Sequence, residues 1–198
     1  MIIYQILFLV LTYFIAAIPF GFLIAKKFAK KDIRQLGSKN IGATNVARTV
    51  GKKLGLLTLL LDGLKGAAMV VIARFNFHEF DNLHLFLVSV SFIAVAAHIF
   101  PIYLKFQGGK GVATAIAVLF ALDSVVGLLV VCFWILSFCL FRISSVSSLI
   151  AIFSSIIISS NYGAPMSQII FCTALFILIL FRHKENLLRL AIGEEKKI

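Results

Sequence analysis

Long apolar runs separated by short polar connectors make up most of the chain. A membrane-spanning helix needs about 20 apolar residues, or about 17 to 25 when tilt is allowed. Seven runs are candidates: Ile3–Ile24, Leu54–Arg74, Leu83–Leu104, Val112–Leu122, Val125–Phe141, Val146–Ser160 and Met166–Phe181. The fourth is too short to cross unaided, and Asp123 and Ser124 separate it from the fifth by a tight turn. The pattern predicts an all-α membrane protein, a seven-transmembrane helical bundle that forms a single integral membrane domain over residues 1–198.

Basic residues are distributed unevenly among the connectors. If the connector Ala25–Lys53 lies in the cytoplasm and the spans alternate from there, 17 of the 19 Lys and Arg residues lie on that side. The opposite connectors contain acidic residues but no Lys or Arg, and only Lys65 and Arg74 fall within a predicted span. An excess of Lys and Arg marks the cytoplasmic side of a membrane protein. We therefore expect the N-terminus outside and the C-terminus in the cytoplasm.

Composition supports the membrane class and excludes others. The chain is 61% hydrophobic, more than a soluble domain of 198 residues could bury. Its net charge of +11 does not indicate nucleic acid, because the basic residues lie in short connectors and not on one face of a soluble element. Cys132, Cys139 and Cys172 lie inside apolar runs without metal-ligand spacing, so they do not indicate a metal site.

The first cytoplasmic connector contains closely spaced turn residues and side-chain donors. Between Gly37 and Arg48 these include Ser38, Asn40, Gly42, Thr44 and Asn45. Such groups suit a phosphate better than a hydrophobic contact. The alternative is a solvated loop whose charges serve only membrane orientation.

Two further candidates lie along the second and third spans. Asp62 and Lys65 are three residues apart and share a helix face within the second span, where ionisable groups usually mark a site or a buried ion pair. His98 lies near the end of the third span, and the Gly108-Gly109-Lys110-Gly111 loop with Thr114 follows that span. Glycine amides, a lysine and the start of a helix suit an anion. The spacing is not that of a Walker A loop, and a flexible turn and a packed interfacial histidine are the alternatives.

Two polar clusters lie near the ends of the last spans. Ser148 belongs to a group of serines that begins the sixth span, where it could serve only as part of a helix cap. Arg182, His183 and Asn186 lie at the end of the seventh span, where they could serve only as an interfacial anchor. The predicted topology nevertheless brings all five polar clusters to one side of the bundle, which favours a site there.

Four stretches together resemble the bacterial acyl-phosphate:glycerol-3-phosphate acyltransferases, the PlsY family. They are G-S-x-N-x-G-A-T-N-x-x-R from Gly37, Asp62–Gly66, H-x-F-P with G-G-K-G-V-A-T from His98, and R-H-x-x-N-x-x-R-L-x-x-G-x-E from Arg182. The resemblance extends from Ile18 to the tail, with Lys39, Ile41 and Gln107 at variable or departing positions.

The resemblance implies an enzyme of phospholipid synthesis in the bacterial inner membrane. It would transfer a fatty acyl group from acyl phosphate to the 1-hydroxyl of glycerol-3-phosphate on the cytoplasmic side, as a monomer among membrane lipids. Neither a metal nor a cofactor is expected. Catalytic roles are implied for Ser38, Arg48, Lys110, Ser148, His183 and Asn186. Substrate binding is expected of Asn40, Gly42, Thr44, Asn45, Asp62, Lys65, His98, Gly108, Gly109, Gly111, Thr114 and Arg182. Whether His183 or a substrate phosphate removes the hydroxyl proton stays open.

Two other functions compete with this one. A transporter or channel for an organic phosphate would use Asp62 and Lys65 to line a path. Inverted halves and paired broken helices are not evident in the sequence, however, and polar residues do not continue to the outer face. A non-catalytic scaffold for anionic lipids would explain the basic connectors but not the Ser-x-Asn and Gly-Gly-Lys-Gly sequences.

Overall fold

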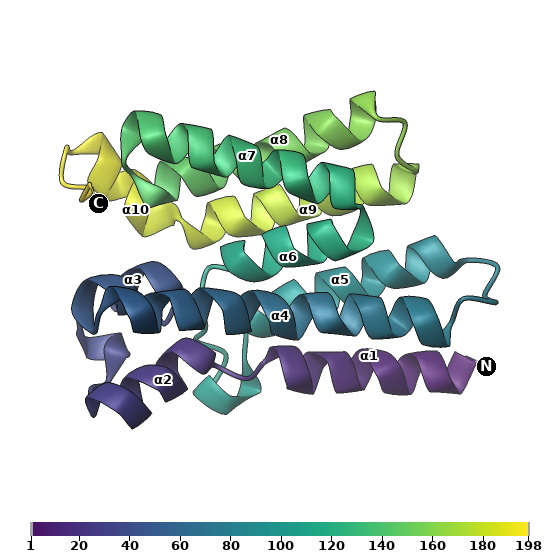
Figure 1. Ribbon diagram of the computed structural model, residues 1–198, viewed down its shortest axis with the longest axis horizontal. Helices are drawn as coiled ribbons and strands as arrows, with labels where there is room; N and C mark the ends of the chain where they lie inside the picture. The colour runs from purple at the N-terminus through teal and green to yellow at the C-terminus, as the bar shows by residue number, and fades with distance from the viewer. Residues whose placement is uncertain (1, 198) are drawn as a thin grey trace.

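A computed structural model of the protein describes residues 2–197, and all regular secondary structure in this part of the chain is helical. Its elements are α1 (Ile2–Ala16), α2 (Phe20–Ala29), η1 (Ile33–Gln35), α3 (Ala43–Thr49), α4 (Lys52–Asn76), α5 (Leu83–Ile99), η2 (Ile102–Leu104), α6 (Val112–Leu122), α7 (Ser124–Phe141), α8 (Ser144–Asn161), α9 (Met166–Arg182) and α10 (Lys184–Ala191). The long helices run roughly along one direction, with α2, α3 and α10 gathered at the end opposite the N-terminus (Figure 1). The all-α prediction is confirmed.

Several of these helices are long and apolar enough to cross a membrane. Within residues 2–197 five segments qualify by length and composition: Ile2–Ala29, Lys52–Asn76, Leu83–Leu104, Ser124–Phe141 and Ser144–Asn161. The pair α9 and α10, bent by 59°, would make a sixth. The short α6 has the bounds predicted from the sequence, and at about 1.5 Å per residue its 11 residues extend only about 16 Å.

The first span differs from its prediction because it is broken. Helix α1 ends at Ala16 and α2 begins at Phe20, whereas the apolar run predicted one helix from Ile3 to Ile24. Pro19 explains the break, since proline has no N–H to donate and its ring clashes with the preceding turn. At the break the Ile18 carbonyl accepts hydrogen bonds from the Phe20 N–H at 3.1 Å and from Lys65 Nζ at 2.7 Å.

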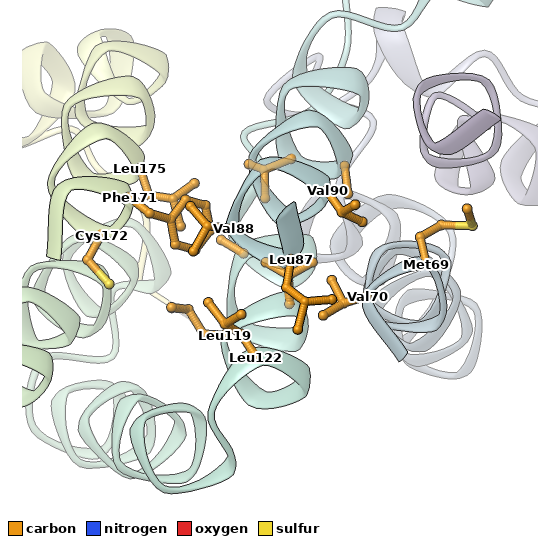
Figure 2. Packing of buried hydrophobic residues seen from close by; sticks show 14 of the residues in the cluster. Met69, Val70, Leu87, Val88, Val90, Leu119, Leu122, Phe171, Cys172 and Leu175 are labelled. Atoms are coloured by element: carbon orange, nitrogen blue, oxygen red, sulfur yellow. The ribbon is translucent and has the colours of Figure 1, made fainter. Parts of the chain in front are cut away.

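Apolar side chains fill the interior between α4, α5, α6 and α9. Met69 and Val70 of α4 face Leu87 and Val90 of α5, and Leu119 continues the cluster on α6 (Figure 2). Leucines such as Leu60, Leu136 and Leu140 are instead exposed on the outside of the bundle. In water such an apolar surface would be costly, so it fits a lipid environment.

Helix α6 is held closely against α4. Gly63 and Gly66 of α4 face α6, and an added Cβ at Gly66 would lie 2.7 Å from Thr114 Cγ2. Small residues allow such close approach of membrane helices. At the other end of α6, Arg74 of α4 donates to the carbonyls of Ala121 and Leu122 at 2.9 and 2.7 Å. The short helix is therefore fixed at both ends by α4.

Candidate functional site

A cavity of about 880 Å³ opens where α3, the start of α6 and α10 meet. One part of its wall is polar and comes from the 37–48 loop, Lys110 and the C-terminal segment. The other part is apolar and comes from α4, α6 and α7: Leu59, Leu60, Leu64, Ile116, Phe120, Val131 and Trp134. The cavity therefore suits a ligand with a charged head and an apolar chain.

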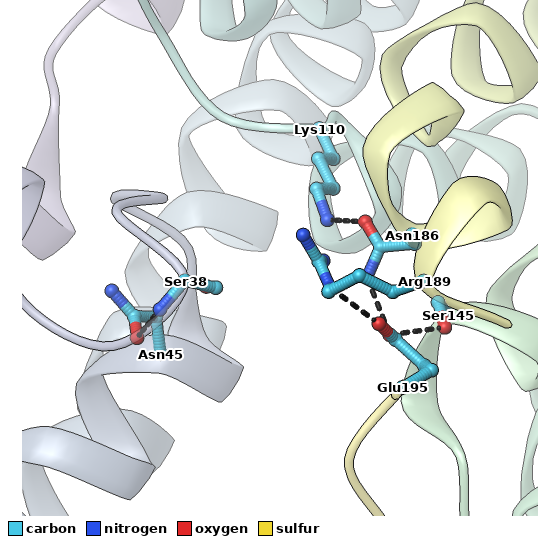
Figure 3. A network of polar contacts seen from close by, with 7 residues as sticks. All are labelled: Ser38, Asn45, Lys110, Ser145, Asn186, Arg189 and Glu195. Atoms are coloured by element: carbon cyan, nitrogen blue, oxygen red, sulfur yellow. Dashed lines mark hydrogen bonds and ion pairs between the residues drawn. The ribbon is translucent and has the colours of Figure 1, made fainter. Parts of the chain in front are cut away.

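Asn45 organises the first polar loop. Its side chain is buried, and its Nδ2 donates to the carbonyls of Ile33, Leu36 and Asn40 at 3.3, 2.9 and 2.8 Å. Its Oδ1 accepts from the backbone N–H of Ser38 at 3.0 Å (Figure 3). The Asn45 amide is thus largely occupied in holding the loop.

Other polar groups of this loop face the cavity. The Asn40 Oδ1 accepts from the Gly42 N–H at 2.8 Å, which forms a local turn before α3. Thr44 Oγ1 lies 3.2 Å from Ser144 Oγ and connects α3 to α8. Ser38 and Arg48 also line the cavity, and neither side chain has a hydrogen bond to another described residue. Ser38 of the loop and Arg48 of α3 are therefore the groups of residues 37–48 best placed to meet a ligand.

The glycine loop between α5 and α6 is folded back on the end of α5. Gly108 N donates to Ile99 O at 3.1 Å and Gly109 N donates to His98 O at 3.2 Å. Both glycines are buried, and a Cβ at Gly109 would collide with the His98 ring. Only Lys110 and Gly111 of this loop line the cavity, and Gly111 has a φ of +86° that favours glycine. The sequence led us to expect Gly108 and Gly109 in the substrate-binding site. They shape the loop instead and do not line the cavity.

A network of charged and polar groups closes the other side of the cavity. Lys110 Nζ donates to Asn186 Oδ1, and Asn186 Nδ2 donates to Glu195 Oε1 at 2.5 Å (Figure 3). Glu195 also accepts from Ser145 Oγ at 2.7 Å and from Arg189 Nε at 2.9 Å. Burial opposes ionisation of Glu195, but these three hydrogen bonds outweigh it and lower the pKa of its carboxyl. Glu195 thus fixes the C-terminal segment over the site as an anion.

Sequence reasoning missed Glu195 and Arg189 as site residues. Both line the cavity. The signal was present, because the C-terminal stretch that carries the family resemblance includes Arg189 and ends on Glu195.

His183 and Lys110 have charge states set mainly by burial. Burial, and then the positive charge of Lys110, lowers the pKa of His183 to about 4. His183 Nδ1 lies 2.8 Å from the Ile179 carbonyl, so we assign the proton to Nδ1 and leave Nε2 as an acceptor. Burial lowers the pKa of the Lys110 ammonium to about 8. At neutral pH the site therefore holds a neutral imidazole and a mostly charged ammonium.

Ser148 lines the cavity with its hydroxyl already engaged. Its Oγ donates to the Ser144 carbonyl at 2.7 Å and accepts from Trp134 Nε1 at 3.2 Å. A hydroxyl whose proton goes to its own helix is poorly placed as a nucleophile. Among residues 2–197 no three His, Cys, Asp or Glu side chains are grouped so that they could hold a metal ion.

Three of the expected binding residues lie outside the cavity lining and make structural contacts. Lys65 is 6% exposed, with its Nζ 3.0 Å from Asp62 Oδ1. Thr114 Oγ1 donates to the Asp62 carbonyl at 2.8 Å, and Arg182 donates to the Gly108 carbonyl at 3.2 Å. The remaining expected residues, apart from Gly108 and Gly109, line the cavity: Ser38, Asn40, Gly42, Thr44, Asn45, Arg48, Asp62, His98, Lys110, Gly111, Ser148, His183 and Asn186.

Comparison with known proteins assigns this arrangement to a family. Residues 6–193 match the family model described as glycerol-3-phosphate acyltransferase. The chain belongs to the PlsY family of glycerol-3-phosphate acyltransferases. The acyltransferase is 42% identical over 189 residues to the glycerol-3-phosphate acyltransferase of Pelagibacter ubique (strain HTCC1062), covering 94% of this chain and 93% of the relative. It is also 42% identical over 196 residues to that of Ehrlichia ruminantium (strain Gardel), covering 98% and 97% of the two chains.

Solved structures support the same assignment. The crystal structure of PlsY (YgiH), an integral membrane glycerol 3-phosphate acyltransferase, in its glycerol 3-phosphate form matches with a TM-score of 0.91 and 35% identity. Its lysophosphatidic acid form matches with a TM-score of 0.88 and 34% identity. Both matches cover 98% of this chain and 95% of the other. The acyltransferase is therefore an integral membrane enzyme.

Proposed function

We propose that the enzyme transfers a fatty acyl group from acyl phosphate to the 1-hydroxyl of sn-glycerol-3-phosphate, with lysophosphatidic acid and inorganic phosphate as products. The observation that carries this proposal is the division of one cavity wall into a polar and an apolar part. The acyl chain would lie along Leu60, Leu64 and Phe120, which line the cavity and are also exposed. The phosphates of both substrates would meet the basic and amide groups at the polar part.

Charge complementarity supports the binding roles. Arg48 of α3 and Lys110 of the glycine loop both line the polar part, so two anions can bind close together without leaving their charges unpaired. Ser38 and Asn40 would help to hold glycerol-3-phosphate, and Gly111 would present its backbone to the acyl phosphate.

The transfer itself needs no covalent enzyme intermediate. Acyl phosphate is a mixed anhydride, so the 1-hydroxyl oxygen can attack its carbonyl carbon directly while the carbon–oxygen bond to phosphate breaks. Positioning and stabilisation of the developing negative charge supply the rate enhancement. The hydroxyl proton would pass either to Nε2 of the neutral His183 or to a phosphate oxygen, and both acceptors are compatible with the lowered pKa of His183.

We also propose that the chain is a monomeric, single-domain bundle of seven membrane helices in the bacterial inner membrane. The seven would be α1 continued by α2, α4, α5, α6, α7, α8 and α9, with α6 crossing only in part. The concentration of Lys and Arg beside the cavity supports a cytoplasmic site and an outer N-terminus. Labelling of single cysteines with a membrane-impermeant thiol reagent tests this: a cysteine at Lys39 should react only from inside, and one at Asp81 only from outside.

The transfer is tested with purified protein, glycerol-3-phosphate and palmitoyl phosphate, with lysophosphatidic acid as the product measured. Palmitoyl-CoA serves as the control donor. Lys110→Ala should abolish transfer while leaving thermal unfolding close to that of the wild type. Absence of product, or product from the CoA donor alone, would refute the proposed reaction, and a fully active Lys110→Ala variant would refute the anion-binding role.

A further inference from the structure

Lys65 is a charged residue that the proposed reaction does not use. It lies in the middle of α4, 6% exposed, beside Asp62 at 2%. Burying a lysine and an aspartate inside a membrane bundle is costly even when they pair, and well-packed apolar residues often serve stability as well. Stability alone therefore does not explain the presence of this pair.

The first connection of the pair leads to the 37–48 loop. Lys65 Nζ donates to the Ile18 carbonyl at 2.7 Å and so fixes the break between α1 and α2. Just beyond the break, Gly21 of α2 packs directly on the Ile41 carbonyl, with no room for a Cβ. Ile41 is buried between Asn40 and Gly42, which line the cavity. The position of the break therefore sets the position of the first anion-binding loop.

The second connection leads to the glycine loop. Asp62 Oδ1 lies 3.0 Å from Lys65 Nζ and 3.6 Å from Nδ1 of the buried His98. The other side of the His98 ring contacts Gly109, and the His98 carbonyl accepts the Gly109 N–H at 3.2 Å. The residue after Gly109 is Lys110. The same ion pair thus supports the loop that carries the second anion-binding group.

We propose that Lys65 is a positioning residue that, with Asp62, fixes the distance between the 37–48 loop and the Gly108–Gly111 loop. Each loop is linked to a different partner of one ion pair, the first by way of Ile18 and α2 and the second by way of His98, so the pair acts as a common reference for both. The inference rests on the proposed function, because its purpose is to hold two substrates in reacting geometry. A misplacement of about 1 Å can reduce turnover about a hundredfold.

The test compares the double variant Asp62→Asn/Lys65→Met with the wild type in lipid nanodiscs. Lys65→Met alone leaves Asp62 without its counter-ion and risks misfolding, whereas the double variant removes both charges and keeps the side-chain volumes. Gln168→Met is the matched control. Gln168 is equally buried, lies at the start of α9, and hydrogen-bonds to His84 and Ser159 away from the cavity.

The double variant should unfold at a temperature close to that of the wild type, with kcat for palmitoyl phosphate reduced about ten- to hundredfold. The KM for glycerol-3-phosphate should change much less, since each loop keeps its own ligand groups. Amide hydrogen exchange should become faster in residues 37–48 and 108–111. Gln168→Met should leave kcat and exchange in both loops unchanged, even where it lowers thermal stability.

Wild-type kcat and loop exchange in the double variant would overturn the inference. A fall in kcat that Gln168→Met reproduces in proportion to its loss of thermal stability would overturn it equally. The exchange measurement does not require the reaction. Absence of transfer by the wild type would therefore refute the proposed function and leave the test of Lys65 intact.

Discussion

Replacing Lys110 with arginine over a series of pH values separates the charge of this residue from its shape. Burial lowers the pKa of the Lys110 ammonium to about 8, well below the ordinary value for lysine. Above that pKa the charged fraction falls about tenfold for each pH unit, so about a tenth remains at pH 9. If Lys110 binds the substrate phosphates only in its charged ammonium form, kcat/KM should fall by the same factor.

We assign the fall of kcat/KM at alkaline pH to Lys110 and not to the ionisable groups beside it. The lowered pKa of Glu195 keeps its carboxylate charged through the range, and His183, with its pKa lowered to about 4, is already neutral. The substrate phosphate is also fully ionised, since its second pKa is about 6. The pH dependence of kcat/KM reports the pKa of the free enzyme.

The assay measures initial rates of lysophosphatidic acid formation at low glycerol-3-phosphate between pH 7 and 10. The wild type should show a descending limb with an apparent pKa near 8, as the lowered pKa of Lys110 requires. Lys110→Arg should lack the limb whatever its absolute rate, because a guanidinium stays charged. An identical limb in Lys110→Arg, or a flat wild-type profile, would refute the assignment.

Three further changes test the packing and charge of the bundle. Arg74→Gln should lower the free energy of unfolding by about 1 kcal/mol, because the hydrogen bonds to the last carbonyls of α6 are lost. The control Lys53→Gln, at an exposed position, should leave it unchanged. Equal melting temperatures of the two variants would contradict this. Gly66→Ala should cost about 1 to 3 kcal/mol in thermal unfolding, because the new Cβ would lie 2.7 Å from Thr114 Cγ2; an unchanged melting temperature would show that α6 moves freely. Because the pKa of His183 is lowered to about 4, the unfolded chain binds its proton first as pH falls below about 6.5, and stability should decline by up to about 3 kcal/mol between these values. His183→Gln should lose that part of the decline in acid unfolding curves, and an unaltered slope would exclude the histidine as its cause.

The sequence predicted the helices more successfully than their breaks. Apolar runs determine which segments enter a membrane, so Val112–Leu122 has the predicted bounds and α7 differs from its prediction by one residue. The break after Ala16 was missed, although Pro19 within the apolar run was its signal. Average hydropathy does not register a single missing N–H.

The site residues were predicted by chemical type, and this approach has a clear physical limit. Polar groups at one end of the bundle were correctly gathered, but type and spacing do not show which way a side chain points. Gly109 is of the residue type expected in a phosphate-binding loop, yet its lack of a side chain makes room for the His98 ring. Asn45 has the donors of a ligand-binding residue, yet its Nδ2 donates to backbone carbonyls. Such contacts become visible only when distant segments are packed.

The two basic residues inside the predicted spans have a common explanation. Within lipid every backbone carbonyl needs a partner, so a membrane helix that stops early must find one elsewhere. Lys65 supplies such a partner at the break after α1, where the Ile18 carbonyl also accepts from the Phe20 N–H, and Arg74 supplies one at the end of α6. Both come from α4, which therefore allows two neighbouring helices to end short. The first ending lets α2 turn against Ile41 beside the cavity, and the second completes a short helix whose beginning carries Gly111. Lys65 and Arg74 are costly to place inside the membrane, but together they shape the cavity in which a charged substrate and an acyl chain can meet.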